Sequence, residues 1–369
     1  MKFFKREQTK KIRVGNIFIG GGAPISIQSM TNTDTKNWKN TVNQIKQLEE
    51  AGCEIVRVSL PTIEAAQNIS KIKKNIRIPL VADVHFDHLI ALCAIEQGVD
   101  KLRINPGNIG SKSKIYTVAK AAKKAHIPIR IGVNLGSLKS AHNFSDSTSR
   151  ARSLVNSATE HIEILEKLDF YDIVVSLKAS NIETTVEAYK LFAKKRSYPL
   201  HLGITEAGSV FNGNIKSAVG LGIMLYNGIG DTIRVSLTAD PVEEVRAAYS
   251  ILQSLNLKSS GLEIISCPTC SRTEVDLIKI VSEFEKKVYS IKDLKKISPP
   301  IKVALMGCVV NGPGEAKDAD FGIAGGKNCG LLFENGKIVA KIHPDKWVSV
   351  LIDTVKKFIK LRNSAKNSA

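Results

Sequence analysis

Short apolar runs alternate with amphipathic segments over most of the chain. Between residues 24 and 257 a strand-like run, one or two polar residues and a helical pattern recur eight times. In the helical patterns, apolar residues stand three and four positions apart. The expected strands are Pro24 to Met30, Glu54 to Leu60, Ile78 to Phe86, Lys101 to Asn105, Pro128 to Leu135, Asp172 to Ser180, Pro199 to Glu206 and Asp231 to Leu237. The expected helices include Asn37 to Ala51, Ile63 to Lys74, Ser113 to Ala125, Ser147 to Leu168, Ile182 to Lys194 and Val242 to Leu255.

Eight strand–helix units predict an α/β fold, a closed parallel (βα)8 barrel of the TIM type. No two expected strands are close enough in the chain to be joined by a two-residue turn, which disfavours antiparallel hairpins. A doubly wound open sheet is the alternative, but the Gly-x-Gly-x-x-Gly loop that it often has is missing after the first strand. We therefore expect residues 1–257 to form a barrel domain.

The pattern changes after Leu257. Lys258 to Gly261 look like a linker, and residues 262–369 combine short strands with helices, which predicts a smaller α+β domain. Its clearest expected elements are a helix from Glu274 to Lys286, a hairpin from Leu331 to Ile342 that turns at Asn335-Gly336, and a last helix from Pro344 to about Leu361.

Composition favours a folded protein of a reducing compartment. The chain has 369 residues, of which 43% are hydrophobic, enough to fill two cores. No apolar run approaches the roughly 18 to 20 residues that a membrane span needs, and the first residues lack the apolar core of a signal peptide. Three of the six cysteines fall in one motif, and the six do not form an even framework, so we expect the cytoplasm and no membrane.

The net charge of +18 raises the question of nucleic-acid binding. Much of the excess lies at the two ends, in residues 1–13 and in the tail after Asp353, which we expect to be frayed and solvated. No aromatic platform or nucleic-acid motif accompanies the charge, so we expect no nucleic-acid partner. A basic surface is equally suited to an acidic protein partner.

Polar residues follow the predicted strands where each one ends. Residues two apart on a strand share a face, and the carboxyl ends of barrel strands are where barrel enzymes do chemistry. Five cations lie at such ends on five strands, and like charges that converge need an anion between them. The pattern predicts a ligand with several negative charges, most simply a diphosphate. The strand ends read Arg57 with Ser59, Asp83 with His85, Arg103 with Asn105, Arg130 with Asn134, Ser176 with Lys178, His201 with Glu206, and Arg234 with Ser236.

Three titratable residues of this ring are not fixed cations. Asp83, His85 and Glu206 are the candidates for moving protons, and the neighbouring cations would hold the two carboxylates ionised.

A second motif lies in the smaller domain. Cys267-Pro-Thr-Cys270 supplies two thiolates one turn apart, and Cys308 follows a strand-like run and precedes a glycine-rich turn. Such a set predicts zinc or an iron–sulfur cluster, with either Cys329 or Glu315 as fourth ligand. Cys53 and Cys93 fall on expected buried faces, where cysteine packs as a small apolar residue.

Together these residues resemble the family of 4-hydroxy-3-methylbut-2-enyl diphosphate synthases, iron–sulfur enzymes of the methylerythritol phosphate route to isoprenoids. The resemblance covers nearly the whole chain in its two-domain form, and Ser271, where a glycine is common, is its one visible departure. The most specific segments are Val81 to Phe86, Arg103 to Asn108, Gly203 to Gly208, Cys267 to Cys270 and Asn311 to Ala316.

The resemblance implies a ligand for each site. One [4Fe-4S] cluster per subunit would be held by Cys267, Cys270, Cys308 and Glu315, which decides against Cys329. The substrate would be 2-C-methyl-D-erythritol 2,4-cyclodiphosphate. Its diphosphate would contact Arg57, Arg103, Arg130, Lys178, Arg234 and Ser236, with Asn105 and Asn134 beside them, and its carbon skeleton would lie near Asp83, His85 and Glu206.

The implied reaction is a two-electron reductive ring opening and dehydroxylation, with Glu206 as the expected proton-transfer residue. Flavodoxin or ferredoxin would supply the electrons, because no flavin or nicotinamide motif is present. A homodimer is also implied, with each cluster domain over the barrel of the other subunit. The rival hypothesis is a zinc-stapled barrel that binds a phosphorylated ligand or RNA without redox chemistry.

Overall fold

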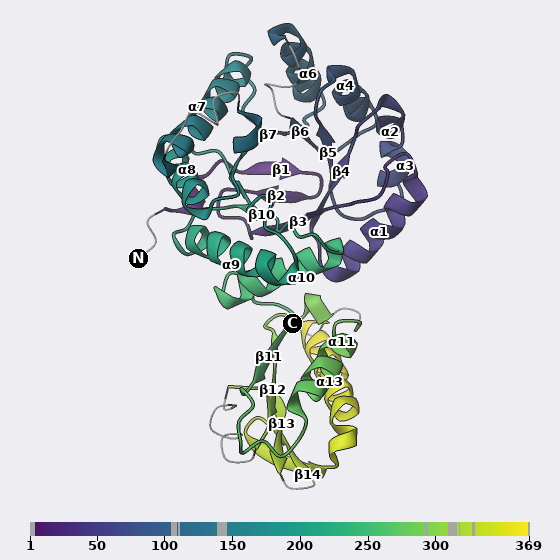
Figure 1. The fold of residues 1–369 in the computed structure, drawn as a ribbon. Coiled ribbons are helices and arrows are strands. Elements are labelled where there is room, and N and C mark those ends of the chain that lie inside the picture. Colours follow the sequence, from purple (N-terminus) through teal and green to yellow (C-terminus); the bar gives the residue numbers. More distant parts are fainter. Residues whose placement is uncertain are drawn as a thin grey trace. The chain divides into compact units, whose positions relative to one another are not determined.

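The computed structural model describes residues 4–104, 109, 111–138, 146–291, 294–308, 316, 318–326 and 329–367. The chain divides into two compact units, Met1–Lys258 and Ser259–Ala369 (Figure 1). Each unit has its own hydrophobic core. None of the described helices is long and apolar enough to cross a membrane.

The first unit is a parallel barrel of eight strands. They are hydrogen-bonded in the order β8-β7-β6-β5-β4-β3-β10-β9, and a parallel bridge between Val175 and Leu200 joins β8 to β9 and closes the ring. The predicted (βα)8 barrel is therefore confirmed, and the open sheet is excluded. The strands are β3 (Ser26–Met30), β4 (Ile55–Ser59), β5 (Leu80–Val84), β6 (Lys101–Ile104), β7 (Ile129–Asn134), β8 (Ile173–Lys178), β9 (His201–Leu202) and β10 (Thr232–Ile233).

Helices surround the barrel (Figure 1). All six expected helices form, and the one expected over Ile63 to Lys74 is split at Asn68, whose side-chain amide donates to the Lys36 carbonyl at 3.1 Å. Two more, α4 and α9, are apolar around most of their surface and so gave no clear stripe. The helices are α1 (Trp38–Ala51), α2 (Ile63–Gln67), α3 (Ile69–Lys73), α4 (His88–Glu96), α6 (Lys112–Lys124), α7 (Ser147–Glu166), α8 (Ile182–Lys195), α9 (Val210–Tyr226) and α10 (Pro241–Ser254).

Alternation along the strands separates the core from the site. On β7, Ile129, Ile131 and Val133 pack outward against the helices, so Arg130 points into the barrel. The same alternation holds on β8, where Ile173, Val175 and Leu177 belong to the outer core. The barrel interior is thus left to polar residues at its carboxyl end.

The amino-terminal end of the barrel is closed by a hairpin, β1 (Ile12–Val14) and β2 (Ile17–Ile19), preceded by the short 3-10 helix Arg6–Gln8. Ile12, Val14 and Ile19 pack against strand residues of the barrel floor. Our expectation that residues 1–13 are frayed is wrong for the described part of that segment, because Arg6 Nε also donates to the Gly230 carbonyl at 2.8 Å. The apolar alternation was hidden among lysines and arginines.

The second unit is a five-stranded sheet in the order β11 to β15. β11 (Leu262–Ser266), β12 (Ile301–Met306) and β13 (Phe321–Gly326) are parallel, and β14 (Cys329–Glu334) and β15 (Lys337–Ile342) form the expected hairpin. Helices α11 (Leu277–Val288) and α13 (Trp347–Asn367) share one core with the sheet. The tail after Asp353 is helical rather than frayed through the described residues, since Arg362 pairs with Asp320 at 2.9 Å. Short 3-10 turns occur at Leu135–Ser137, Leu294–Lys296 and Pro344–Lys346.

Candidate active site

The structure brings the five predicted cations together inside the barrel mouth. Arg130, Lys178 and Arg103 are only 1%, 6% and 7% exposed. Burial first, and then repulsion by all four arginines of the ring, lowers the pKa of Lys178 well below its ordinary value. These five residues, on β4, β6, β7, β8 and just after β10, are hereafter called the cation ring: Arg57, Arg103, Arg130, Lys178 and Arg234.

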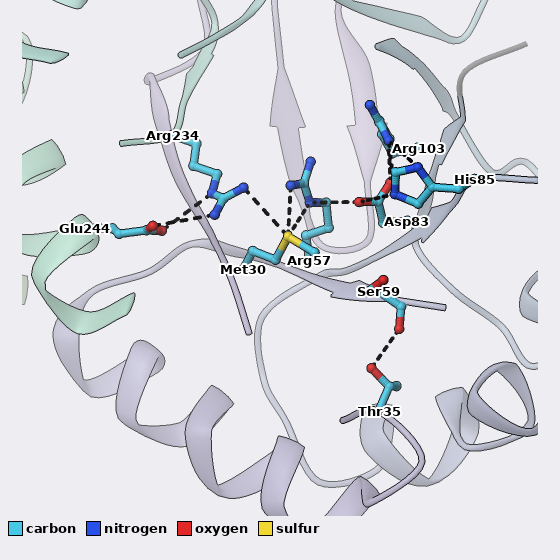
Figure 2. A network of polar contacts seen from close by, with 9 residues as sticks. All are labelled: Met30, Thr35, Arg57, Ser59, Asp83, His85, Arg103, Arg234 and Glu244. Carbon is cyan, nitrogen blue, oxygen red and sulfur yellow. Dashed lines mark hydrogen bonds and ion pairs between the residues drawn. The ribbon is translucent and has the colours of Figure 1, made fainter. Parts of the chain in front are cut away.

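Two carboxylates offset part of the charge of the ring. Asp83 on β5 lies between Arg57, at 3.5 Å, and Arg103, at 3.0 Å, while Glu244 on α10 pairs with Arg234 at 3.5 Å (Figure 2). Burial alone would raise the pKa of Asp83, but Arg57, His85 and Arg103 together hold it well below the usual range. Asp83 is therefore a fixed carboxylate that orients two arginines.

The other two cations, Arg130 and Lys178, have no ion pair with a carboxylate among the described residues. Arg130 Nε and Nη1 are buried without a hydrogen-bond partner in the same part of the chain. Burial, and then Arg57 and Arg103, lower the pKa of Arg130 well below its ordinary value. Buried cations without partners are costly. The mouth is consequently built to receive a multiply charged anion.

A methionine lies between two members of the ring. Met30 Sδ accepts hydrogen bonds from Arg57 Nη2 at 2.8 Å and from Arg234 Nη1 at 3.7 Å, so one soft, uncharged atom separates two guanidinium groups (Figure 2). Sequence reasoning missed Met30 and also Glu244, because Met30 ends β3 but carries no charge, and Glu244 stands on helix α10 and not at a strand end.

Two glycines make room for the long side chains. A Cβ atom on Gly132 would lie 2.8 Å from Arg103 Nε, and one on Gly203 would lie 2.5 Å from Lys178 Nζ. Both positions need the absence of a side chain.

The remaining predicted substrate contacts are placed unevenly. Asn134 ends β7 opposite Lys178 in the strand register, and Ser236 is half-buried two residues after Arg234. Asn105 lies outside the described residues.

The candidate proton carriers differ in exposure. His85 Nε2 lies 3.3 Å from Asp83 Oδ2, and the side chain of His85 is 41% exposed. Glu206 is exposed in the loop after β9 and has a φ of 53°, in the left-handed region that disfavours a side chain. An exposed carboxyl group at the mouth can exchange its proton with water, which buried Asp83 cannot do as readily.

The cysteine motif surrounds Gly307 in the second unit. Cys267 follows β11, and Cys308 follows the adjacent parallel strand β12. Gly307 N–H donates to Cys267 Sγ at 3.2 Å, and Glu274 N–H donates to the Gly307 carbonyl at 3.1 Å. The segment from Cys267 to Glu274 therefore closes around the residue that precedes Cys308.

Cys270 is held within this turn. Its N–H donates to Thr273 Oγ1 at 3.1 Å, and Thr273 Cγ2 would be 2.7 Å from a Cβ atom on Gly307. A hydrogen bond from the Arg272 backbone is the main cause that lowers the pKa of the Cys270 thiol, which is fully exposed. A lower thiol pKa favours the thiolate that metals bind.

The donor set suits an iron–sulfur cluster in its chemistry. Thiolate is the ligand that iron–sulfur clusters prefer, and the Gly307 N–H already donates to one of the three sulfurs, that of Cys267, as is usual around thiolate-bound iron. Within the described residues, no three His, Cys, Asp or Glu side chains lie close enough together to hold a metal ion. Glu315, the predicted fourth ligand, lies outside the described residues, and Cys329 begins β14 opposite Gly326.

Two family models match the chain. The GcpE TIM-barrel domain matches residues 9–249, and the GcpE protein C-terminal domain matches residues 263–357. The chain belongs to the GcpE family. This membership confirms the resemblance drawn from the motifs.

Curated relatives match over almost their full length. One from Clostridium tetani is 55% identical over 95% of this chain and 99% of its own, and one from Thermodesulfovibrio yellowstonii is 56% identical over 96% of this chain and 99% of its own. Both are named 4-hydroxy-3-methylbut-2-en-1-yl diphosphate synthase (flavodoxin). Among solved structures, a Yersinia pestis dihydropteroate synthase aligns with a TM-score of 0.49 at 13% identity over 67% of this chain and 98% of that one, which is too distant to support an argument.

Proposed function

We propose that this protein makes 4-hydroxy-3-methylbut-2-en-1-yl diphosphate by reductive ring opening and dehydroxylation of 2-C-methyl-D-erythritol 2,4-cyclodiphosphate. The observation behind this proposal is the cation ring, which has five cations against the carboxylates of Asp83 and Glu244. The naming of full-length relatives supports the same reaction. The barrel unit is the substrate-binding domain, and the second unit is the cluster domain.

The ring binds the diphosphate and orients it. Arg57 and Arg234 converge on Met30 from two sides, so a phosphate group that displaces the sulfur contact receives donors from both. Arg130 and Lys178 supply the charge that no carboxylate of the described chain offsets, with Ser236, Asn134 and Asn105 as further contacts. The carbon skeleton then faces His85 and Glu206.

Cys267, Cys270, Cys308 and Glu315 hold one [4Fe-4S] cluster per subunit. When bound, the cluster supplies electrons one at a time. A carboxylate is a harder and more labile iron ligand than a thiolate, so Glu315 would be the most easily exchanged of the four ligands. Thiolate ligands also require a reducing compartment, which favours the cytoplasm.

Glu206 transfers the proton that the departing hydroxyl group needs. It is the exposed carboxyl group of the mouth, whereas Asp83 is fixed as a carboxylate by Arg57 and Arg103. His85 hydrogen-bonds Asp83 and is half-exposed, so it is the second candidate for proton movement.

The electron donor is an external flavodoxin, as the printed names of the relatives state for those proteins, with ferredoxin as the alternative. Both are small acidic proteins, and a chain with a net charge of +18 attracts such a partner.

We also propose a homodimer in which each cluster domain covers the barrel mouth of the other subunit. The outer face of α9 supports an association between copies, because its exposed residues are almost all apolar: Phe211, Ile215, Val219, Ile223 and Tyr226. Exposed apolar stripes of this kind mark interfaces.

Sedimentation velocity tests the dimer. The wild-type chain should sediment as a dimer, and Ile215→Glu should shift it towards monomer and lower turnover. Asn156→Glu, which adds the same charge on the exposed face of α7, should stay dimeric. An active wild-type monomer would contradict the proposal.

Anaerobic purification tests the function as a whole. The protein should be brown, with broad visible absorption, and should convert the cyclodiphosphate to the alkenyl diphosphate when it is given reduced flavodoxin. A colourless zinc protein without turnover would instead support the zinc-stapled binding protein, which no observation favours at present.

A further inference from the structure

A second tier of polar side chains lies beneath the mouth of the barrel. Gln28 on β3 and Lys101 on β6 stand two residues before Met30 and Arg103, and His201 on β9 stands two residues before Gly203, which directly follows that strand. Residues two apart share a strand face, so all three point inward and lie deeper in the barrel. Their exposed fractions are 1%, 0% and 0%, and the hairpin of β1 and β2 closes the barrel below them.

This tier contains many polar atoms that find no partner. Lys101 Nζ, His201 Nε2 and both amide atoms of the Gln28 side chain are buried without a hydrogen bond among the described residues. His201 Nδ1 is satisfied by Thr232 Oγ1 at 2.7 Å. A folded protein rarely leaves such groups unpaired without a functional reason.

Lys101 is the basic residue of the tier. The charged or titratable groups that face it are Arg57 from β4, Arg130 from β7 and His201 from β9. Asp83, the mouth carboxylate on the neighbouring strand β5, is already engaged by Arg57 and Arg103. Burial first, and then Arg130 and Arg57, lower the pKa of Lys101 to about 7. In the empty protein this lysine is thus close to losing its proton.

An anion bound in the mouth would raise the pKa of Lys101 again. Arg57 and Arg130 repel a proton on Lys101, and a diphosphate bound to the ring offsets their charge and attracts the proton. Lys101 is better poised to respond than the arginines, which keep their protons near neutral pH. The proton comes from the buffer acid in the solvent, so an N–H bond forms on Lys101 as the acid loses its proton and becomes its conjugate base.

We propose that Lys101 is a positioning residue for the diphosphate. Lys101 binds a proton when the anion enters the mouth, and its positive charge then balances the ligand charge from below through Arg57 and Arg130. This inference rests on the proposed function, since it requires the cation ring to bind a diphosphate group. It adds a residue that touches no substrate, and it couples substrate binding to proton uptake.

Calorimetric titration of the full-length protein with inorganic pyrophosphate tests the coupling. Measuring the heat at pH 8 in two buffers of different ionisation enthalpy gives the number of protons taken up. Lys101→Met keeps the length of the side chain without its charge, and should take up fewer protons than wild type, by about half to one. Its affinity for pyrophosphate should be about tenfold weaker. Lys120→Met removes an exposed lysine of α6 and should match wild type in both measurements.

The dependence of affinity on pH provides a second readout. Because wild type takes up the extra proton, its affinity for pyrophosphate should fall more steeply above pH 7 than that of Lys101→Met. The titration of pyrophosphate itself is common to both proteins and cancels in the comparison.

Thermal unfolding separates this role from a structural one. The pKa of Lys101 is lower in the folded state than in the unfolded state, so this lysine opposes folding at neutral pH, and less so as pH rises towards 10. Lys101→Met should therefore raise the Tm of the ligand-free protein while it weakens pyrophosphate binding. If Lys101 served only for packing, Lys101→Met would instead lower the Tm and leave the proton count unchanged.

The outcomes distinguish the two proposals. Equal proton counts in wild type and Lys101→Met would overturn the role of Lys101 and leave the proposed function standing. Failure of wild type to bind pyrophosphate would overturn both. If Lys101→Met does not fold, Lys101→Arg replaces it: a permanent cation should keep the affinity within about threefold of wild type and abolish the proton uptake at this position.

Discussion

The barrel mouth and the cysteine turn both lie at the carboxyl ends of parallel strands, yet they hold their side chains in different ways. In the mouth, Arg103, Arg130 and Lys178 stand on strands and are buried, so the register of the sheet fixes them. In the cysteine turn, Cys267 and Cys308 lie just beyond their strands, and Cys270 is fully exposed.

This difference shows how each site gets its order. The fold alone assembles the mouth, although burying its cations costs free energy, and a bound anion would neutralise their charge. In the cysteine turn, a few hydrogen bonds hold the segment from Cys267 to Glu274 against Gly307, and a bound cluster would supply the rest of the order of the cysteines. The two regions should therefore respond to mutation in separable ways.

The largest expected effect lies in the cysteine turn. Cys308→Ser removes one of the proposed thiolate ligands, and turnover should fall by at least about a thousandfold because the cluster that delivers electrons would be lost. Visible absorption and iron content check the loss of the cluster. Cys93→Ser, at a half-buried cysteine of the barrel, should keep both. Wild-type iron content in Cys308→Ser would remove this residue from the ligand set.

Arg130→Met acts on the mouth alone. The affinity for the cyclodiphosphate should fall by about 150-fold, because a buried charged donor is lost, while the visible spectrum stays unchanged. Loss of a buried cation without a carboxylate partner should also raise the Tm of the ligand-free protein. Arg246→Met is the matched control, since Arg246 pairs with Glu243 at 2.6 Å on the surface. Binding equal to wild type would contradict the assigned role of Arg130.

Glu206→Gln sharpens the comparison, because the cysteine turn should keep its cluster and the mouth should still bind the cyclodiphosphate. Cluster absorption and cyclodiphosphate binding should persist while turnover falls by about a hundredfold, since an amide cannot donate the proton. Glu243→Gln, on the exterior of α10, provides the control. Turnover at the wild-type rate would exclude Glu206 from proton transfer and leave His85 as the candidate.

Gly203→Ala should have the smallest effect. A Cβ atom there would lie 2.5 Å from Lys178 Nζ, so the ammonium group must move and the affinity for the cyclodiphosphate should fall by about tenfold. Unchanged affinity in Gly203→Ala would show that Lys178 tolerates displacement.

Sequence patterns predicted residues whose position depends on strand alternation. The eight strands, and with them the inward direction of Arg57, Arg103 and Arg130, followed from period-two patterns. Met30 and Lys101 were missed, because their importance appears only when the register places them among the cations. Gly203 was quoted only within a motif, since the clash that it avoids depends on the path of the Lys178 side chain.

One element was missed because basic residues surround its apolar pattern. The hairpin of β1 and β2 was overlooked because its alternation of Ile12, Val14, Ile17 and Ile19 lies in a basic segment. The predictions for Asn105 and Glu315 fall outside the described residues and remain predictions. Both stand beyond strand ends, where periodicity no longer determines position.

The most direct test of the account is the dissociation constant of the cyclodiphosphate for the Cys308→Ser protein, measured without turnover. If the barrel mouth binds the diphosphate by itself, the affinity should stay within about tenfold of wild type although the cluster is gone. A loss of more than about a hundredfold would contradict the account, because it would mean that the cation ring does not hold the substrate without the cluster.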